Sequence, residues 1–367
     1  MIVLGLYGAC GWHPTANERW VHSSGAALID GGELVCAISE ERLTKDKYTG
    51  VFPEKSIDYV LDGRSTGEVD VVALATNVHI GSDEERKQAE KVLRRIFPQS
   101  AIVLVDHHKA HAFLAYYSSP FQQAAVFTFD GAGTAFHSNG IVEVENATYS
   151  LAQAGQIACV YHSMMGGAAK EGLFALGETY NALSRHVYQK KVPEYVEGNP
   201  YLFMETAPGK VMGLSGYGKA LNKLGLFKVV MDDFYFPTVL GNVNTIQGKP
   251  EDIACELQDE FEQALVDWIG AIPEPLRSPY WCLGGGCALN IMANRRILDS
   301  TYVKELWAHP ASTDCGLPIG AATAVTEDEL NRTSLHNYYT GKSYTKEDIE
   351  DALEEYGVDT ELEASSP

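Results

Sequence analysis

Short apolar runs alternate with amphipathic segments along the first 120 residues of the chain. The run at residues 1–8 predicts a first strand, and two further strands are joined at Asp30-Gly31-Gly32. Asp-Gly between apolar runs is a strong hairpin signal, because glycine accepts the positive φ that the turn needs. The pattern then predicts a helix, a strand, a charged helix and a strand, at residues 53–61, 69–76, 82–97 and 101–106. Strands that alternate with helices are typical of an α/β lobe.

The same plan starts again near residue 124. An apolar run at 124–129 predicts a buried strand that leads into a glycine turn, and residues 140–155 indicate further strands of a meander. The elements expected after these are a helical region, an amphipathic helix, and a strand whose glycine turn opens another helix, at residues 171–187, 253–272 and 280–298.

The repeated start predicts a duplicated α/β fold of the actin/hexokinase-like type, in which two lobes enclose a ligand cleft. We expect a first lobe at residues 1–120, a second lobe at 121–320, a helix at 321–340 that returns toward the first lobe, and an acidic tail or linker at 341–367. Thr345 and Asp348 in this tail have the spacing of a capping box and predict a short helix.

Composition narrows the class of protein. Of the 367 residues, 45% are hydrophobic and 21% are charged, which is the balance of a globular enzyme. Seven scattered cysteines without a CxxC pair argue against a disulfide framework and a thiolate zinc site, and favour a reducing, cytoplasmic compartment. No apolar run is long enough to cross a bilayer, so we expect no membrane partner. The net charge of −21 counts against nonspecific binding of nucleic acid.

Three histidines follow Asp106 within six residues of the chain. On a helix, His107 and His111 would lie one turn apart on the same face and could share a metal ion, while His108 would point elsewhere. Further ligands could come from Asp130, before a glycine turn, and Asp314. From the spacing alone, metal binding and simple hydrogen bonding within the helix are both open.

Three other segments can each be interpreted either as part of a functional site or as a structural or solvent-exposed feature. His22 precedes a buried strand and could act as a general base, whereas His13 is better explained as an exposed loop residue. The basic turn at residues 42–47 could neutralise a phosphate or be a solvated hairpin end. The glycines at 284–286 could bring backbone amides to a phosphate, or could serve close packing.

Six segments of the chain, taken in order, resemble those of one enzyme family. They read HSSGAALIDGGELVCAISEERLTKDKYTGVFP, DHHKAHAFLAYYSSPF, AAVFTFDGAGT, KVMGLSGYGK, LGGGCALN and HPASTDCGLPIGAA. Together they resemble the nodulation-protein and cephem O-carbamoyltransferases. The fold of that family is similar to those of the tRNA threonylcarbamoyl transferase and the hydrogenase-maturation carbamoyltransferase.

The resemblance implies a metal site and a catalytic base. In these relatives a helical histidine pair and aspartates from both lobes hold an iron-type metal that contacts the phosphate of a carbamoyl-adenylate. The implied ligands here are His107, His111, Asp130 and Asp314, with iron as the first choice and manganese, magnesium or zinc as alternatives. The histidine that activates the acceptor hydroxyl in the family matches His22.

The resemblance also implies that ATP-derived carbamoyl-adenylate, with carbamoyl phosphate as the donor, binds a basic turn, several glycines and an asparagine. The residues are Arg42, Lys45, Lys47, Gly131, Gly133, Lys210, Gly213, Gly284, Gly285, Gly286 and Asn290. Lys47 best matches the phosphate-near lysine of the family, and residues 284–286 with Asn290 fall where relatives hold adenosine.

The chain departs from the family in two ways. Ser23 follows His22, where the family usually has an aspartate, and the loop before His22 is longer than usual. Full-length relatives continue into a second domain that makes carbamoyl-adenylate. We expect that this step is supplied by a separate domain or subunit, that the given sequence is part of a longer chain, or that the donor differs.

We therefore expect an O-carbamoyltransferase whose acceptor alcohol is a small metabolite, a sugar, or a hydroxymethylated base in DNA. Two alternatives are a non-catalytic nucleotide-binding subunit of a split carbamoyltransferase and an actin-fold kinase.

Overall fold

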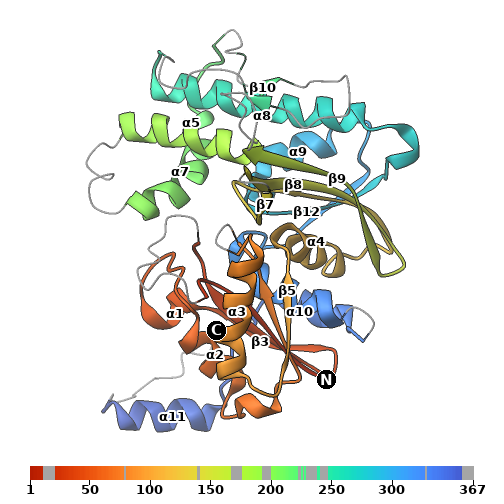
Figure 1. Cartoon of the computed structure of the whole chain (residues 1–367). Helices are drawn as coiled ribbons and strands as arrows, with labels where there is room; N and C mark the ends of the chain where they lie inside the picture. The colour runs from red at the N-terminus through yellow and green to blue at the C-terminus, as the bar shows by residue number, and fades with distance from the viewer. Residues whose placement is uncertain are drawn as a thin grey trace.

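The structure of the chain is a computed structural model that describes residues 1–10, 21–77, 80–138, 141–166, 176–191, 200–221, 225, 227–228, 238–239, 247–326 and 329–357. These residues form two lobes, one below the other in the view of Figure 1. The chain builds the lower lobe first and the upper lobe second. Its blue C-terminal helices then return to the lower lobe.

Five strands make the first sheet, in the order β3-β2-β1-β4-β5. β1 is antiparallel to β2 and parallel to β4. The hairpin between β2 and β3 turns at Gly31 and Gly32, both at positive φ, which confirms the turn predicted from Asp-Gly. The strand bounds are Ile2–Tyr7 (β1), Gly25–Asp30 (β2), Glu33–Ser39 (β3), Val71–Ala75 (β4) and Ala101–Val105 (β5).

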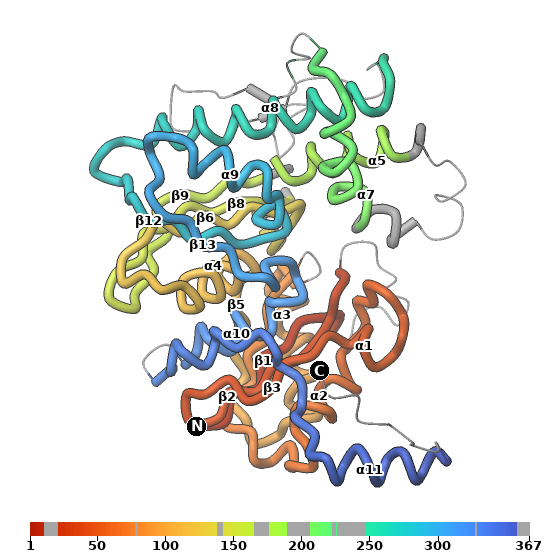
Figure 2. Tube along the Cα trace, turned by 180° about the vertical axis from the view of Figure 1, so that it is seen from behind, coloured from red at the N-terminus to blue at the C-terminus, as the bar shows by residue number. Residues whose placement is uncertain are grey.

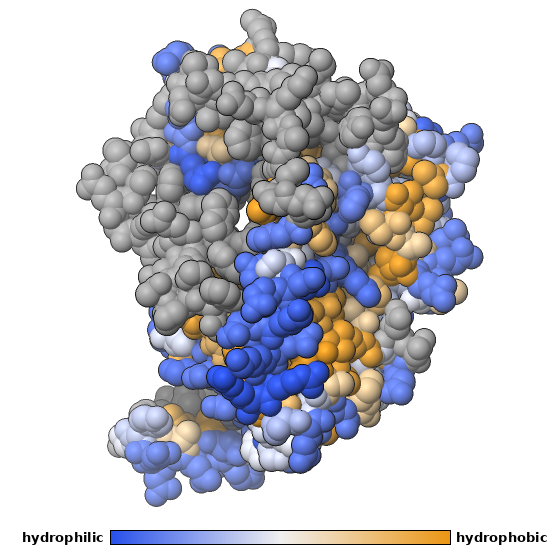
Figure 3. Space-filling model, in the orientation of Figure 1, coloured by the Kyte–Doolittle hydropathy of each residue, from blue (hydrophilic) through white to orange (hydrophobic). Residues whose placement is uncertain are grey.

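Helices cover one face of this sheet. α2 (Glu54–Leu61) packs on β2 and β3, and α3 (Asp83–Ile96) packs against β5. The short α1 (Glu40–Thr44) follows β3, and a single 3₁₀ turn occupies Thr66–Glu68. The charged residues of α3 form the blue band that runs down the lower lobe in Figure 3, while Ala89 and Leu93 are buried beneath it.

The second sheet repeats the connectivity of the first. Its order is β13-β12-β6-β8-β7, and β9 also pairs with β8. β6 is antiparallel to β8 and parallel to β12, as β1 is to β2 and β4. The strand bounds are Gln123–Phe129 (β6), Ala135–Ser138 (β7), Ile141–Gln153 (β8), Gln156–Gly166 (β9), Tyr280–Gly284 (β12) and Glu305–Ala308 (β13). The predicted duplicated fold is confirmed by these two sheets.

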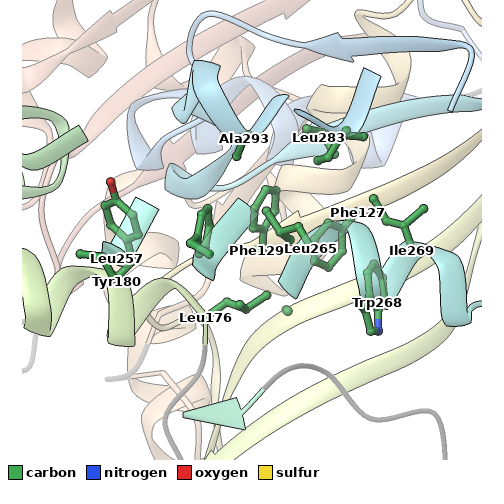
Figure 4. Close-up of a cluster of buried hydrophobic side chains, with 14 of the residues drawn as sticks. Phe127, Phe129, Leu176, Tyr180, Leu257, Leu265, Trp268, Ile269, Leu283 and Ala293 are labelled. Carbon is green, nitrogen blue, oxygen red and sulfur yellow. The ribbon is translucent and has the colours of Figure 1, made fainter. Parts of the chain in front are cut away.

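A helical layer packs on the outer face of the second sheet. Figure 4 shows its core, where Leu265 and Trp268 of α8 meet Phe127 of β6, and the rings of Phe127 and Trp268 stack with centroids 4.6 Å apart. The helices of this lobe are α5 (Leu176–Lys191), α7 (Pro200–Ser215), α8 (Pro250–Ala271) and α9 (Ile291–Leu298). Smaller elements are β10 (Phe227–Lys228), β11 (Thr238–Val239), and 3₁₀ turns at Glu274–Leu276 and Gly286–Leu289.

Two helices lie between the lobes, as Figure 2 shows from behind. α4 (His107–Tyr117) packs on β6 and β12, and α10 (Leu317–Thr326) packs on both α4 and β1. The approach is close, because a Cβ atom at Gly320 would lie 2.1 Å from the carbonyl oxygen of Ala110. A 3₁₀ turn at Asp314–Gly316 leads directly into α10. Elements from both halves of the chain thus meet at α4.

The segment after α10 stays on the first lobe. It forms a 3₁₀ turn at Arg332–His336 and the exposed helix α11 (Lys346–Glu355). The capping box predicted for Thr345 and Asp348 is confirmed, since each side chain bonds the backbone amide of the other residue. Among the described residues, no helix combines the length and the apolar character that a membrane span needs.

Candidate metal centre and binding cavity

The N-terminal turn of α4 presents two histidines on one face, as their spacing predicts. The Nε2 atoms of His107 and His111 lie 3.2 Å apart, and both side chains are almost fully buried. His108 faces the second sheet instead: its Nδ1 lies 2.8 Å from the hydroxyl of Thr128, and its Nε2 lies 3.3 Å from the carbonyl oxygen of Glu145. Both ring nitrogens of His108 therefore have partners away from the histidine pair.

Two aspartates from distant segments face the pair. Asp130 follows β6, and its Oδ2 lies 3.3 Å from Nε2 of His111. Asp314 opens the turn before α10, and its Oδ1 lies 3.5 Å from Nε2 of His107 and 3.6 Å from Nε2 of His111. One ligand atom from each of the four residues lies within 4.8 Å of every other. The structure thus brings together all four residues proposed as metal ligands.

Neighbouring groups orient the two carboxylates. Asp130 accepts hydrogen bonds from the backbone amides of Gly131, at 2.7 Å, and Gly286, at 2.9 Å. Asp314 accepts a hydrogen bond from the hydroxyl of Tyr7, with its Oδ2 at 2.6 Å. The oxygens that face the histidines are consequently held in place.

The cluster concentrates negative charge in a buried place. Burial works against a charge on His111, but hydrogen bonds to Asp130 and Asp314 outweigh it and raise the pKa of His111 to about 9. Burial also disfavours the charge on Asp130, yet its hydrogen bond with His111 holds the pKa of that carboxyl below its usual value. For His107, burial dominates and lowers the pKa. One imidazole thus carries a proton between two carboxylates.

This donor set fits a divalent cation. Two imidazoles and two carboxylates suit a borderline ion such as iron, zinc or manganese. The proton on His111 balances part of the charge of Asp130 and Asp314, and a divalent ion would balance both carboxylates once that proton leaves. The site therefore has the ligands and the uncompensated charge that such an ion needs.

His22 lies beside the cluster at the entry to β2. Its Nε2 is 3.8 Å from Oδ2 of Asp314, and its Nδ1 is 3.2 Å from the hydroxyl of Ser23. Ser23 is buried and has a φ of 59°, a conformation that costs a non-glycine residue roughly 1–2 kcal/mol. Ser23, which stands where the resembling family usually has an aspartate, thus places its hydroxyl beside the His22 ring. His13 and the loop at residues 11–20 lie outside the described residues.

A cavity of about 290 Å³ opens from the cluster into the second lobe. His22, Asp130 and Asp314 line one end of it. The other lining residues come from the glycine turns after β6 and β12, from α5, α7 and α8, from the cap of α9 and from the residue before Asp314: Gly131, Ala132, Gly177, Glu178, Tyr180, Asn181, Pro208, Gly209, Met212, Phe261, Gly286, Cys287, Leu289, Asn290 and Thr313. The polar cluster and a largely apolar chamber are thus parts of one cavity.

Three of the residues predicted to bind the nucleotide line this cavity, namely Gly131, Gly286 and Asn290. Gly284 and Gly285 lie behind it: a Cβ on Gly285 would lie 2.4 Å from the carbonyl oxygen of Phe129, and Gly285 has a φ of 84°. These two glycines therefore serve the close approach of the turn to β6 and α4.

The other predicted binding residues lie outside the lining. A Cβ on Gly133 would lie 2.7 Å from the ring of His108, so this glycine makes room for that ring. Lys210 and Gly213 lie on the exposed side of α7.

The basic turn is also set apart from the cavity wall. Its three members, Arg42, Lys45 and Lys47, have mainly local partners: Lys45 donates to the carbonyl oxygen of Arg42, and Lys47 lies 3.5 Å from a carboxylate oxygen of Glu41.

A buried amide network in the wall of the cavity was not anticipated from the sequence. The hydroxyl of Tyr180 donates to Gln258, at 2.6 Å, and the side chains of Gln258 and Asn290 exchange two hydrogen bonds, at 2.9 and 3.1 Å. Asn290 also caps α9, since its Oδ1 accepts from the amide of Ala293. The signal in the sequence that could have indicated this network is the presence of two polar residues, Tyr180 and Gln258, on helix faces that are otherwise apolar.

Known proteins resemble this chain over most of its length. The family described as "Carbamoyltransferase N-terminus" matches residues 16–91, 84–235 and 221–323, which is more than half of the chain. An uncharacterized protein of Synechocystis sp. is 26% identical and covers 93% of this chain and 62% of its own length. Nodulation protein NolNO of Sinorhizobium fredii is 25% identical, over 99% of this chain and 56% of its own length.

The chain thus spans about three fifths of the length of these curated relatives. Among solved structures, T. kodakarensis HypF superposes with a TM-score of 0.50 at 13% identity, over 91% of this chain and 49% of that protein. At such low identity, this likeness shows the fold alone.

Proposed function

This chain belongs to the carbamoyltransferase N-terminus family, and on that premise we propose that it transfers a carbamoyl group from carbamoyl-adenylate to an acceptor hydroxyl. The observation that carries the proposal is the cavity itself. One end holds a histidine beside the four-residue cluster of His107, His111, Asp130 and Asp314, and the rest is a largely apolar chamber of about 290 Å³. A base, a site that fits a divalent cation and space for a planar ring are the parts that this reaction needs.

His22 is the proposed general base. With Nδ1–H donating to the hydroxyl of Ser23, Nε2 keeps a lone pair beside Asp314 at the cavity wall. Nε2 takes the proton from the acceptor hydroxyl while the oxygen attacks the carbamoyl carbon. The new bond joins the acceptor oxygen to that carbon, the bond from carbon to the phosphate oxygen breaks, and AMP leaves with the electron pair.

The four-residue cluster is the proposed metal centre, with iron as the first choice and manganese, magnesium or zinc as alternatives. The ligands would be Nε2 of His107 and His111, Oδ2 of Asp130 and Oδ1 of Asp314, the atoms that face one another. A divalent cation there supplies positive charge for the departing phosphate. The basic turn of Arg42, Lys45 and Lys47 is the proposed second source of positive charge.

The apolar chamber is the proposed site for adenosine. Met212, Phe261 and Leu289 line it and offer faces on which a purine ring can pack. Glu178 also lines it, and one of its oxygens accepts a hydrogen bond from Arg185 at 2.9 Å. The other carboxylate oxygen is then available to accept from a sugar hydroxyl. Asn290, fixed by Gln258, adds an amide donor.

The donor and the acceptor are further parts of the proposal. We propose that carbamoyl-adenylate is made from ATP and carbamoyl phosphate by a separate domain or subunit, because the longer relatives extend well beyond the region matched here. The acceptor is a small metabolite, a sugar, or a hydroxymethylated base in DNA. The net charge of −21 favours the first two.

The test supplies ATP, carbamoyl phosphate, a carbamoyl-adenylate-forming domain of a relative and a panel of alcohols, and follows products by mass spectrometry. We expect a product heavier by one carbamoyl group. The His22→Ala variant should lose roughly 10²–10⁴-fold in rate and keep its metal content. His162→Ala, a change at a largely exposed histidine, is the matched control. Absence of any carbamoylated product with the wild-type chain across the panel would contradict the proposal.

A further inference from the structure

Tyr7 makes a contact that its place in the first sheet does not require. It is the last residue of β1 and is 1% exposed, and its hydroxyl donates to Oδ2 of Asp314 at 2.6 Å. Its ring also meets the ring of His107 edge-on, with centroids 5.9 Å apart. A tyrosine of the first lobe thus touches two of the four residues of the metal centre, one of them 307 positions away in the chain.

We propose that Tyr7 is a positioning residue that makes Asp314 offer a single oxygen, Oδ1, to the metal ion. The inference rests on the metal centre of the proposed function. A free carboxylate can bind an ion through one or both oxygens, and groups that bond the second oxygen decide between these modes. Here Oδ1 faces the histidine pair, at 3.5 and 3.6 Å, while the phenol of Tyr7 occupies Oδ2.

The two carboxylates are held by different kinds of donor. Asp130 is fixed by the backbone amides of Gly131 and Gly286, which no side-chain substitution removes directly. Asp314 is fixed by a side chain that belongs to the other lobe. The geometry of the metal centre therefore depends on Tyr7, and through Tyr7 on the position of β1 relative to the turn before α10.

The same hydrogen bond also sets the surroundings of His22. Oδ2 of Asp314 is 3.8 Å from Nε2 of His22, so the proposed base and the phenol of Tyr7 share one carboxylate oxygen. The phenol of Tyr7 thus holds in place the carboxylate oxygen that lies beside the proposed base. The alternative is that Tyr7 is an ordinary core tyrosine, and that its hydroxyl bonds Asp314 only because a buried hydroxyl needs a hydrogen-bond partner.

The variant Tyr7→Phe separates these interpretations, because it removes one hydroxyl and keeps the ring. Iron(II) or cobalt(II) is titrated into metal-free protein, and the dissociation constant is compared with that of the wild type. We expect binding roughly 10–100-fold weaker. Tyr116→Phe is the matched control, since Tyr116 is a buried tyrosine whose hydroxyl donates to the carbonyl oxygen of Gln122, away from the cluster.

The visible spectrum of bound cobalt(II) is the second readout, because a purely structural role would not change it. If Asp314 turns to bind through both oxygens, the coordination number rises and the absorption bands of the cobalt lose intensity in Tyr7→Phe but not in Tyr116→Phe. The double variant Tyr7→Phe/Asp314→Asn should bind metal no more weakly than Asp314→Asn alone. Tyr7→Met serves in place of Tyr7→Phe if the latter does not fold.

Equal metal affinity and an unchanged cobalt spectrum in Tyr7→Phe would overturn the positioning role and leave the metal centre standing. A wild-type chain that binds no iron, cobalt, manganese or zinc would instead overturn the metal centre on which the inference rests. A lower melting temperature of the metal-free Tyr7→Phe protein with unchanged affinity would show that Tyr7 is a core residue only.

Discussion

Arg332 is expected to be one of the costliest single residues to remove, because it closes the C-terminal end of α4, the helix that carries the histidine pair. Its guanidinium lies 4.6 Å from the centre of the Tyr116 ring. It donates to four backbone carbonyl oxygens, those of Tyr116 at 2.6 Å, Tyr117 at 3.0 Å, Ser119 at 2.8 Å and Phe121 at 3.0 Å. A cation placed at the carbonyl end of a helix also opposes its dipole.

The magnitude follows from these contacts. A hydrogen bond from a charged donor contributes about 1.5–3 kcal/mol, and four bonds from one guanidinium add less than proportionally. The stacking on Tyr116 adds about 0.5–1 kcal/mol. For Arg332→Met we therefore expect a loss of about 3–5 kcal/mol in the free energy of unfolding, since the carbonyl groups lose their donor while the apolar stem is kept.

The assay is urea unfolding followed by circular dichroism, together with hydrogen exchange of the amides of α4. Exchange should rise most in the last turn of α4. Arg295→Met is the matched control, because Arg295 is largely exposed and, among the described residues, pairs with Asp299 just after its own helix, so its removal should leave the free energy of unfolding almost unchanged. A loss for Arg332→Met no larger than that for Arg295→Met, or exchange that rises evenly over the chain, would refute the reasoning.

Three further outcomes are expected. His111→Ala should lose bound metal, measured by mass spectrometry of the elements, while His108→Ala should keep it; loss in the second variant would place the ligands on the other face of α4. In the metal-free protein the pKa of His111 is raised to about 9. Protonation of His111 therefore stabilises the folded state fully below the unfolded pKa of about 6.5, and this contribution is lost as the pH rises through 9. The melting temperature of the wild type should fall over this pH range, and that of His111→Gln should fall less. Gly320→Ala should lower the free energy of unfolding by about 3 kcal/mol or more, because the added Cβ would lie 2.1 Å from a backbone oxygen. Gly213→Ala is the control: its Cβ would meet open space, so thermal melts should show no change or a gain of up to about 1 kcal/mol.

The sequence predicted the strands, and the closeness of the four cluster residues, because the signals for them are either local patterns or segments in the order that the family has. Apolar runs bounded by glycine marked β1 and β6, and helical spacing placed His107 and His111 on one face. That Asp130 and Asp314 join them came from the order of the family's segments, since no local pattern links residues so far apart.

The cavity wall could not be predicted in the same way, because it depends on how helices pack. The resemblance places Lys210 and Gly213 near the nucleotide, yet in the structure both lie on α7, and Pro208, Gly209 and Met212 of that helix line the cavity instead. Tyr7 was read as the end of a strand. Its hydroxyl gains a role only where β1 meets the turn that carries Asp314.

The central claim is that His107, His111, Asp130 and Asp314 form a metal centre at one end of the cavity. Anomalous diffraction from crystals of the iron-loaded protein tests it most directly. The account predicts one strong iron peak about 2.0–2.2 Å from the two Nε2 atoms and from one oxygen of each aspartate. No peak at this cluster, or a peak whose ligands include His108, would contradict it.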